Sequence, residues 1–180
     1  MRIPTMGALV IGAAGASGVA AAQSVEGSIV SGGTTVTSGT ATPGPGVEFR
    51  GEVFRNEIFG VNSADAFIDV DDDGLGASFG IERTAGSAGV SSETPVTFTL
   101  SGAAVAGIAS VDLLDESFGQ DRPVESSFRG GTLTVTLTNG FFVGSSDPSR
   151  AADFGFTPIP EPAAAGVLAL GSAALLRRRG

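Results

Sequence analysis

The chain of 180 residues contains no cysteine, histidine, tryptophan or tyrosine, and all ten of its basic residues are arginine. Without cysteine it cannot form disulfides, thiolate nucleophiles, iron–sulfur clusters or cysteine-bound zinc sites. Without histidine it has no Ser-His-Asp triad, no imidazole metal ligand and no proton shuttle near neutral pH. Without lysine it forms no Schiff base and no P-loop. Carboxylates, arginine and hydroxyls are what remains for chemistry, and this inventory predicts a protein that is not an enzyme.

The first 22 residues have the layout of a secretory signal peptide. One positive charge, Arg2, precedes an uncharged apolar stretch over residues 6–19, and small residues, Ala20 and Ala22, stand at the −3 and −1 positions before Gln23. A buried helix of the mature domain is the alternative, which four glycines within the stretch disfavour. We therefore expect a signal helix over residues 1–22 and cleavage by signal peptidase between Ala22 and Gln23.

The C-terminus has a different layout in three parts. Pro160, Glu161 and Pro162 come first, residues 163–176 carry no charge, and Arg177, Arg178 and Arg179 precede the final glycine. A helix of this length rises ~21 Å, less than the ~30 Å of a bilayer core, but arginine side chains that reach the interface extend its span. Under the positive-inside rule the arginines stay in the cytoplasm. Residues 163–176 are thus expected to form a transmembrane helix with the body of the protein outside.

This combination of Pro160-Glu161-Pro162, an apolar segment and a terminal arginine cluster resembles the PEP-CTERM protein-sorting signal of Gram-negative bacteria, which is also called an ice-binding-protein C-terminal domain. The resemblance covers residues 158–180 only. It implies recognition of the tail by an exosortase, a membrane-embedded enzyme presumed to be a protease or transpeptidase. It also implies an exported surface protein of a biofilm-forming bacterium that makes exopolysaccharide.

The body between these two signals is strongly acidic. Residues 23–159 carry six arginines and 18 aspartates and glutamates, a net charge of −12. Such a charge excludes nucleic acid as a partner and favours solubility and divalent cations. The length fits one domain. Residues 23–46, rich in Gly, Ser, Thr and Pro, are expected to form either one edge strand or a flexible lead-in, and the β-domain proper is expected over residues 47–157.

Side chains in the body alternate with a period of two. In the segment 132–138, Leu133, Val135 and Leu137 face one side and threonines face the other, and Asn139-Gly140 predicts a hairpin into residues 141–143. Segments 95–100, 65–71, 79–81, 47–49, 53–55 and 108–114 are further predicted strands, and no sustained helical period occurs. The sequence predicts an all-β fold, an antiparallel β-sandwich that is jelly-roll-like, with a signal helix before it and a transmembrane helix after it.

The segment from Asp69 to Gly74 carries the clearest chemical motif. Asp69, Asp71 and Asp73 occupy positions 1, 3 and 5 of a calcium-binding loop, with Gly74 at position 6. Position 12 is Gly80 rather than the bidentate glutamate, so an EF-hand is excluded. Two alternatives remain open: a partial calcium loop in a β-hairpin, and a solvated acidic turn, since Asp and Gly favour turns for backbone reasons alone.

Six other carboxylates could supply an acid pair for glycan hydrolysis, although nothing in their spacing selects a pair: Glu48, Glu52, Glu57, Asp112, Asp115 and Glu116. Polysaccharide binding would suit a surface β-domain, but the chain lacks the Trp and Tyr on which sugar rings usually stack.

The function predicted first is therefore an exported, non-enzymatic β-domain. It is held in the inner membrane as an intermediate and then sorted to the cell surface or extracellular matrix. A calcium-dependent polysaccharide-binding module is the alternative, and a carboxylate-based glycan hydrolase is less favoured. The expected partners are signal peptidase, an exosortase-type enzyme and extracellular polysaccharide. Calcium is the one cofactor under consideration.

Overall fold

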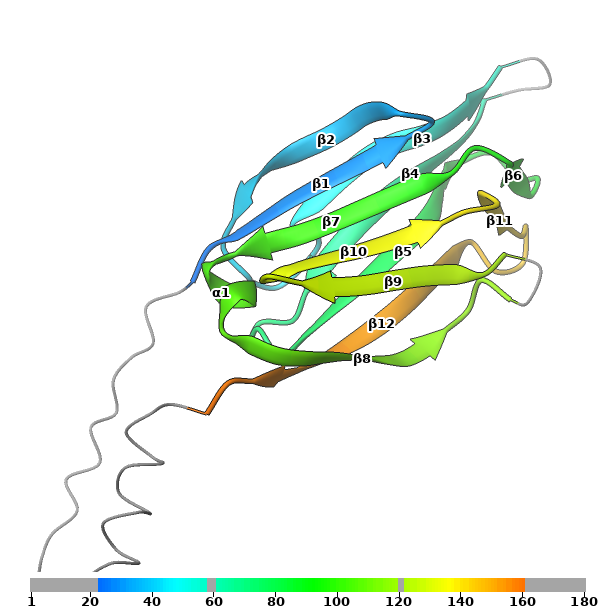
Figure 1. Ribbon diagram of the computed structural model, residues 1–180. Coiled ribbons are helices and arrows are strands. Elements are labelled where there is room, and N and C mark those ends of the chain that lie inside the picture. Colours follow the sequence, from blue (N-terminus) through cyan, green and yellow to red (C-terminus); the bar gives the residue numbers. More distant parts are fainter. Residues whose placement is uncertain (1–22, 58–60, 120–121, 161–180) are drawn as a thin grey trace, which may run out of the picture.

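The described residues of the computed structural model, 23–57, 61–119 and 122–160, form two five-stranded antiparallel sheets that face each other (Figure 1). The prediction of an all-β, antiparallel fold is confirmed. In order across the sheet, sheet A consists of β2 (Thr34–Ala41), β1 (Val25–Ser31), β7 (Val96–Gly102), β10 (Thr132–Leu137) and β9 (Val124–Arg129). Sheet B consists of β3 (Phe49–Asn56), β4 (Asn62–Val70), β5 (Gly76–Ala85), β12 (Ser149–Pro158) and β8 (Ile108–Glu116).

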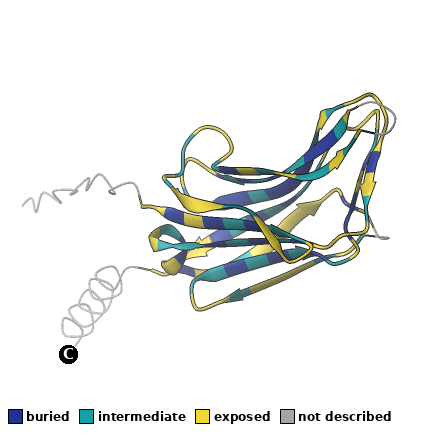
Figure 2. Ribbon diagram, turned by 90° about the horizontal axis from the view of Figure 1, so that it is seen from above, coloured by how far each residue is buried: buried dark blue, intermediate teal, exposed yellow. Residues whose placement is uncertain are grey.

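The core lies between the two sheets, where every second residue of the central strands is buried (Figure 2). The alternation arises because successive side chains of a strand point to opposite faces. Phe79 of β5 lies at the centre and meets two other rings edge to face, Phe98 of β7 at 5.9 Å and Phe154 of β12 at 5.5 Å between ring centroids. The predicted inward positions in residues 65–71, 95–100 and 132–138 are therefore confirmed.

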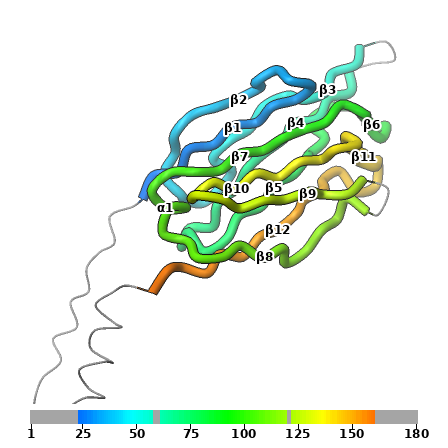
Figure 3. Tube along the Cα trace, viewed as in Figure 1, coloured from blue at the N-terminus to red at the C-terminus, as the bar shows by residue number. Residues whose placement is uncertain are grey.

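The chain crosses between the sheets several times, as the tube in Figure 3 shows. It passes from β2 to β3, from β7 to β8 and from β8 to β9, and the small sheet of β6 (Val90–Ser92) and β11 (Phe141–Val143) lies on the other two crossings. A jelly roll exchanges strands between its two sheets. Here the chain also stays within one sheet from β1 to β2, from β3 to β5 and from β9 to β10.

The segment 23–46 contains an edge strand, β2, but also a second strand, where one edge strand or a flexible lead-in was expected. It forms a hairpin, in which β1 pairs with β2 on one side and with β7 on the other, so that β1 is an interior strand of sheet A. Gly32 and Gly33, with φ of 55° and 83°, make the tight turn between the two strands. The domain therefore begins at Val25 rather than at residue 47. Its Gly, Ser and Thr content hid this, because only Val25 and Ile29 of β1 carry large buried side chains.

The predicted hairpin at Asn139-Gly140 is wrong. β11 pairs with β6, whereas β10 pairs with β7 and β9. A guanidinium N–H of Arg122 donates to the carbonyl oxygens of Asn139 and Ser92, which ties the turn to β6. Gly140, at φ 67°, packs so closely on the Ser92 backbone that a side chain would not fit. This non-local contact redirects the chain into the small sheet.

The expected signal helix and transmembrane helix lie outside the described residues. Within the described ranges the one helix, α1 (Ala103–Ala106), has four residues, and no helix has the length and apolarity needed to cross a membrane.

Candidate functional site

The two chain ends leave the sandwich at one end, beside α1 (Figure 1). The amide of Ala104 donates to the carbonyl of Ser24 over 3.3 Å, and the amide of Ile159 donates to the carbonyl of Gly107 over 2.7 Å. The short segment from Ala104 to Gly107 thus holds both the first and the last strand of the domain at the points where the chain enters and leaves the fold. Of the residues assigned to export and sorting, only Gln23 and Pro160 are described, and both are exposed. Pro160 follows the last residue of β12, Pro158, after a single residue.

The others lie outside the described residues: Ala20, Ala22, Glu161, Pro162, Arg177, Arg178 and Arg179.

The acidic motif forms the turn between β4 and β5. The Asp71 amide donates to the Gly76 carbonyl over 3.0 Å, and the Gly74 amide donates to the Asp71 carbonyl over 2.7 Å. Gly74 has a φ of 68°. A carboxylate oxygen of Asp73 accepts a hydrogen bond from the Leu75 amide at 2.8 Å, the local bond by which aspartate stabilises turns. The Asp73 side chain therefore stabilises the turn by accepting a backbone hydrogen bond.

Asp69 and Asp71 lie near further carboxylates. Partial burial is the main cause that raises the pKa of Asp71 above its ordinary value, and the charges of Asp73, Asp69, Asp153 and Asp72 raise it further. Burial also raises the pKa of Asp69, followed by the charge of Asp72. The charged forms are disfavoured here, because no cation in the described contacts offsets them.

Asp153 of β12 is the member of this group that the sequence motif does not reveal. The registers place Asp69 opposite Ser78 and Ser78 opposite Asp153, and the Ser78 hydroxyl donates to the Asp153 carboxylate over 2.6 Å. A calcium ion takes about six to eight oxygen ligands around one point, several of them from acidic side chains. In the part of the chain that the structure describes, no group of three or more acidic side chains has that arrangement. Calcium binding by Asp69, Asp71 and Asp73 stays a prediction.

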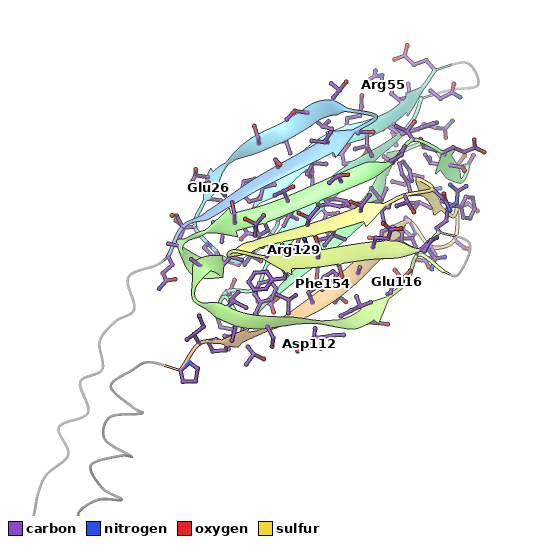
Figure 4. The ribbon with its side chains drawn as sticks, viewed as in Figure 1. Glu26, Arg55, Asp112, Glu116, Arg129 and Phe154 are labelled. Atoms are coloured by element: carbon purple, nitrogen blue, oxygen red, sulfur yellow. The ribbon has the colours of Figure 1, made fainter. Side chains whose placement is uncertain are left out.

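The six carboxylates considered for hydrolysis are divided between the two edges of sheet B. Glu48 accepts hydrogen bonds from the amides of Gly44 and Val70, at 3.1 and 2.6 Å. It thereby fixes the loop before β3 to the end of β4. Glu52 and Glu57 pair with Arg55, at 3.5 and 2.6 Å. The other three, Asp112, Asp115 and Glu116, lie on β8 at the opposite edge, with three strands between (Figure 4). The structure does not bring the two groups together.

The outer face of sheet A is covered by hydroxyl groups. One row crosses all five strands: Ser38 pairs with Ser28, Ser28 with Thr99, Thr99 with Thr134 and Thr134 with Ser127. Neighbouring rows add hydroxyls on both sides, together with the charged residues Glu26, Glu125 and Arg129. We call this surface the hydroxyl face; its members are Ser28, Thr35, Ser38, Thr40, Thr97, Thr99, Ser101, Ser127, Thr132, Thr134 and Thr136.

A shallow depression of about 320 Å³ lies on this face over β1, β2 and β7. Its floor is the backbone of the pair Gly27 and Gly39, two positions at which a β-carbon would point into the sandwich and not onto this face. Its rim carries one carboxylate, that of Glu26, and five hydroxyls, those of Ser28, Ser38, Thr40, Thr99 and Ser101. Figure 4 shows Glu26 near the end at which the chain leaves the sandwich. The depression presents one carboxylate, which accepts hydrogen bonds, and hydroxyl groups, which can either donate or accept them. None of its lining residues is cationic.

Sequence reasoning did not single out the hydroxyl face. The threonines of residues 132–138 were expected to face away from the core, and their alternation was the available signal. Their meeting with β1 and β2 depends on the pairing of strands that are far apart in the chain, which periodicity alone does not provide.

Comparison of the chain with protein-family models, with curated proteins and with solved structures finds no match.

Proposed function

We propose that this protein is an exported, non-enzymatic β-domain that is sorted through a C-terminal PEP-CTERM-type signal to the cell surface or extracellular matrix. The observation that carries the proposal is the common exit of the two chain ends beside α1, through the contacts of Ser24 with Ala104 and of Ile159 with Gly107. Chain ends on one side allow a domain to be joined to the membrane at both ends during export. The rest of the sandwich, with its jelly-roll-like exchange of strands between sheets, then projects away from the bilayer.

The sorting motif begins immediately after the folded domain. Pro160 follows β12 after one residue. On this proposal, residues 163–176 span the membrane and the motif is presented at its outer face. Processing then depends on two separate properties of the tail. The arginines keep the chain end in the cytoplasm, since a charged side chain at the bilayer centre costs roughly 2.5–3.5 kcal/mol on insertion scales. Glu161 serves recognition.

Two tail variants expressed in the producing host test this proposal. Glu161→Ala is expected to insert normally and to accumulate unprocessed in the membrane fraction. Replacement of Arg177, Arg178 and Arg179 by Ser is expected to let the tail pass through the bilayer, which gives unprocessed protein outside the membrane. Normal processing of Glu161→Ala would contradict the sorting role, because a simple hydrophobic anchor has no use for Glu161.

The hydroxyl face favours extracellular polysaccharide as the partner of the exported domain. Sugar hydroxyls can donate to Glu26 and exchange hydrogen bonds with Ser28, Ser38 and Thr99 around the depression. A polysaccharide chain contacts many such groups at once, so that weak individual bonds add up.

Co-sedimentation with the host's own exopolysaccharide tests this partner. Thr99→Val removes a hydroxyl from the middle of the face at nearly constant volume and is expected to lower binding several-fold. Thr157→Val, at an exposed site on β12 of sheet B, is the matched control and is expected to bind as the wild type does. Loss of binding on chelation of calcium, with no effect of Thr99→Val, would instead favour the calcium-dependent module built on Asp69, Asp71 and Asp73.

A further inference from the structure

The four edge strands of the sandwich differ in charge. β2 and β9 are the edges of sheet A, and β3 and β8 are the edges of sheet B. β3 carries Arg50, Glu52 and Arg55, β8 carries Asp112, Asp115 and Glu116, and β9 carries Glu125 and Arg129. β2, with the sequence TTVTSGTA, carries no charged residue and no proline.

Charged side chains and prolines on an edge strand are the usual protection against pairing with another chain. β2 lacks both, and four of its eight residues are threonine, which favours strands. Among the described residues it pairs on one side only, with β1, so the backbone N–H and C=O groups of its other side have no strand partner. Five of its eight residues are exposed to solvent, including Ser38 and Thr40.

A bulge at Ile29 and Val30 interrupts the register near one end of β2. A bulge can itself protect an edge. Here it leaves the stretch from Thr37 to Ala41 in unbroken register with β1, and this regular stretch is long enough for a short strand.

We propose that β2 is a self-association edge, through which a second copy of this chain adds antiparallel to form a continuous sheet across two copies. Two-fold pairing presents the same neutral strand from both sides, so the paired strands themselves bring no charge into the contact. The adjacent edge of sheet B, β3, carries two arginines and one glutamate. The side of the sandwich formed by β8 and β9 carries the three β8 carboxylates. A second copy is therefore repelled at β8 and accepted at β2.

Antiparallel pairing reverses the second copy. Ala41 pairs with Val25 at the end where the chain leaves the sandwich, so the chain ends of the two copies point in opposite directions. In the proposed membrane-bound intermediate, both chain ends of every copy face the bilayer. Two copies in the same bilayer therefore cannot pair in this way, and pairing follows release from the membrane. The pairing itself does not depend on the proposed function.

The test compares two lysine substitutions at the two ends of one row of residues. Ser38 on β2 and Ser127 on β9 are both exposed serines on edge strands of sheet A. The full chain in detergent micelles, studied by sedimentation velocity over a range of concentrations, is expected to form a reversible dimer. Ser38→Lys is expected to weaken the dimer at least tenfold, because two-fold symmetry sets two ammonium groups close together, whereas Ser127→Lys leaves it unchanged.

A second measurement does not depend on added charge. Because the chain has no cysteine, single-cysteine variants report contacts directly. Ser38→Cys, Thr40→Cys and their mixture are expected to form disulfide-linked dimers under mild oxidation at least tenfold faster than Ser127→Cys, and circular dichroism verifies that each variant is folded. A chain that stays monomeric at all concentrations would overturn the proposal. Equal effects of Ser38→Lys and Ser127→Lys on the dimer affinity would also overturn it, because association would then be due to the apolar tail.

Discussion

The ring of Phe49, on β3 of sheet B, lies directly under the α-carbon of Gly27, on β1 of sheet A. A β-carbon at Gly27 would overlap this ring. At Gly39, the cross-strand partner of Gly27, a β-carbon would lie at an ordinary contact distance of 4.0 Å from the same ring. The two glycines therefore differ in the space available to them, although both lie under the depression in the hydroxyl face.

Gly27→Ala is expected to lower the free energy of unfolding by about 1–3 kcal/mol, because the methyl group must displace the buried Phe49 ring. Gly39→Ala, the matched control, is expected to change it by less than about 1 kcal/mol. Urea denaturation of both variants measures the difference. Equal destabilisation would show that the backbone freedom of glycine, and not the Phe49 contact, sets the cost.

Asp71→Asn is expected to stabilise the fold at neutral pH, because it removes a charge that burial and four neighbouring aspartates disfavour. Since the pKa of Asp71 is raised in the folded state, the folded chain binds a proton more tightly than the unfolded chain does. The free energy of unfolding therefore falls as pH rises from the unfolded pKa, ~4, through the folded one. The gain from the substitution, up to about 1 kcal/mol after allowance for solvent screening, is then present at pH 7 and disappears at pH 3.

Thermal melting of wild type and Asp71→Asn at the two pH values measures this gain. Glu93→Gln, a change at an exposed carboxylate between β6 and β7, is the control and is expected to leave the melting temperature unchanged at both. A stabilisation by Asp71→Asn that persists at pH 3 would mean that the charge of Asp71 is not its cause.

The sequence predicted the strand segments better than their partners. Alternation in Leu133, Val135 and Leu137 identified β10, because one face of this strand is fully buried. It could not predict that β10 lies between β7 and β9, since pairing depends on contacts between distant segments. For the same reason Asp69 and Asp71 were recognised from the chain, whereas the approach of Asp153 required the register of β5 with β12.

Calcium provides a test of the acidic turn. If Asp69, Asp71 and Asp73 hold the ion, millimolar calcium raises the melting temperature of the wild type, because a ligand that binds only the folded state stabilises it. At a concentration of 100 times the dissociation constant the gain is ~2.7 kcal/mol. The triple change of these residues to Asn is expected to abolish the rise. The same melting temperature with and without calcium in the wild type would leave Asp73 with its role in the turn and Asp69 and Asp71 as solvated carboxylates.

The central claim, that the protein is exported and processed at both ends, is tested most directly by the intact mass of the protein recovered from the producing cells. The account predicts a mature chain that begins at Gln23 and lacks Arg177, Arg178 and Arg179, with none of this form in the cytoplasm. A mass that corresponds to the whole chain, from Met1 to Gly180, in most of the surface-bound or released protein would contradict it.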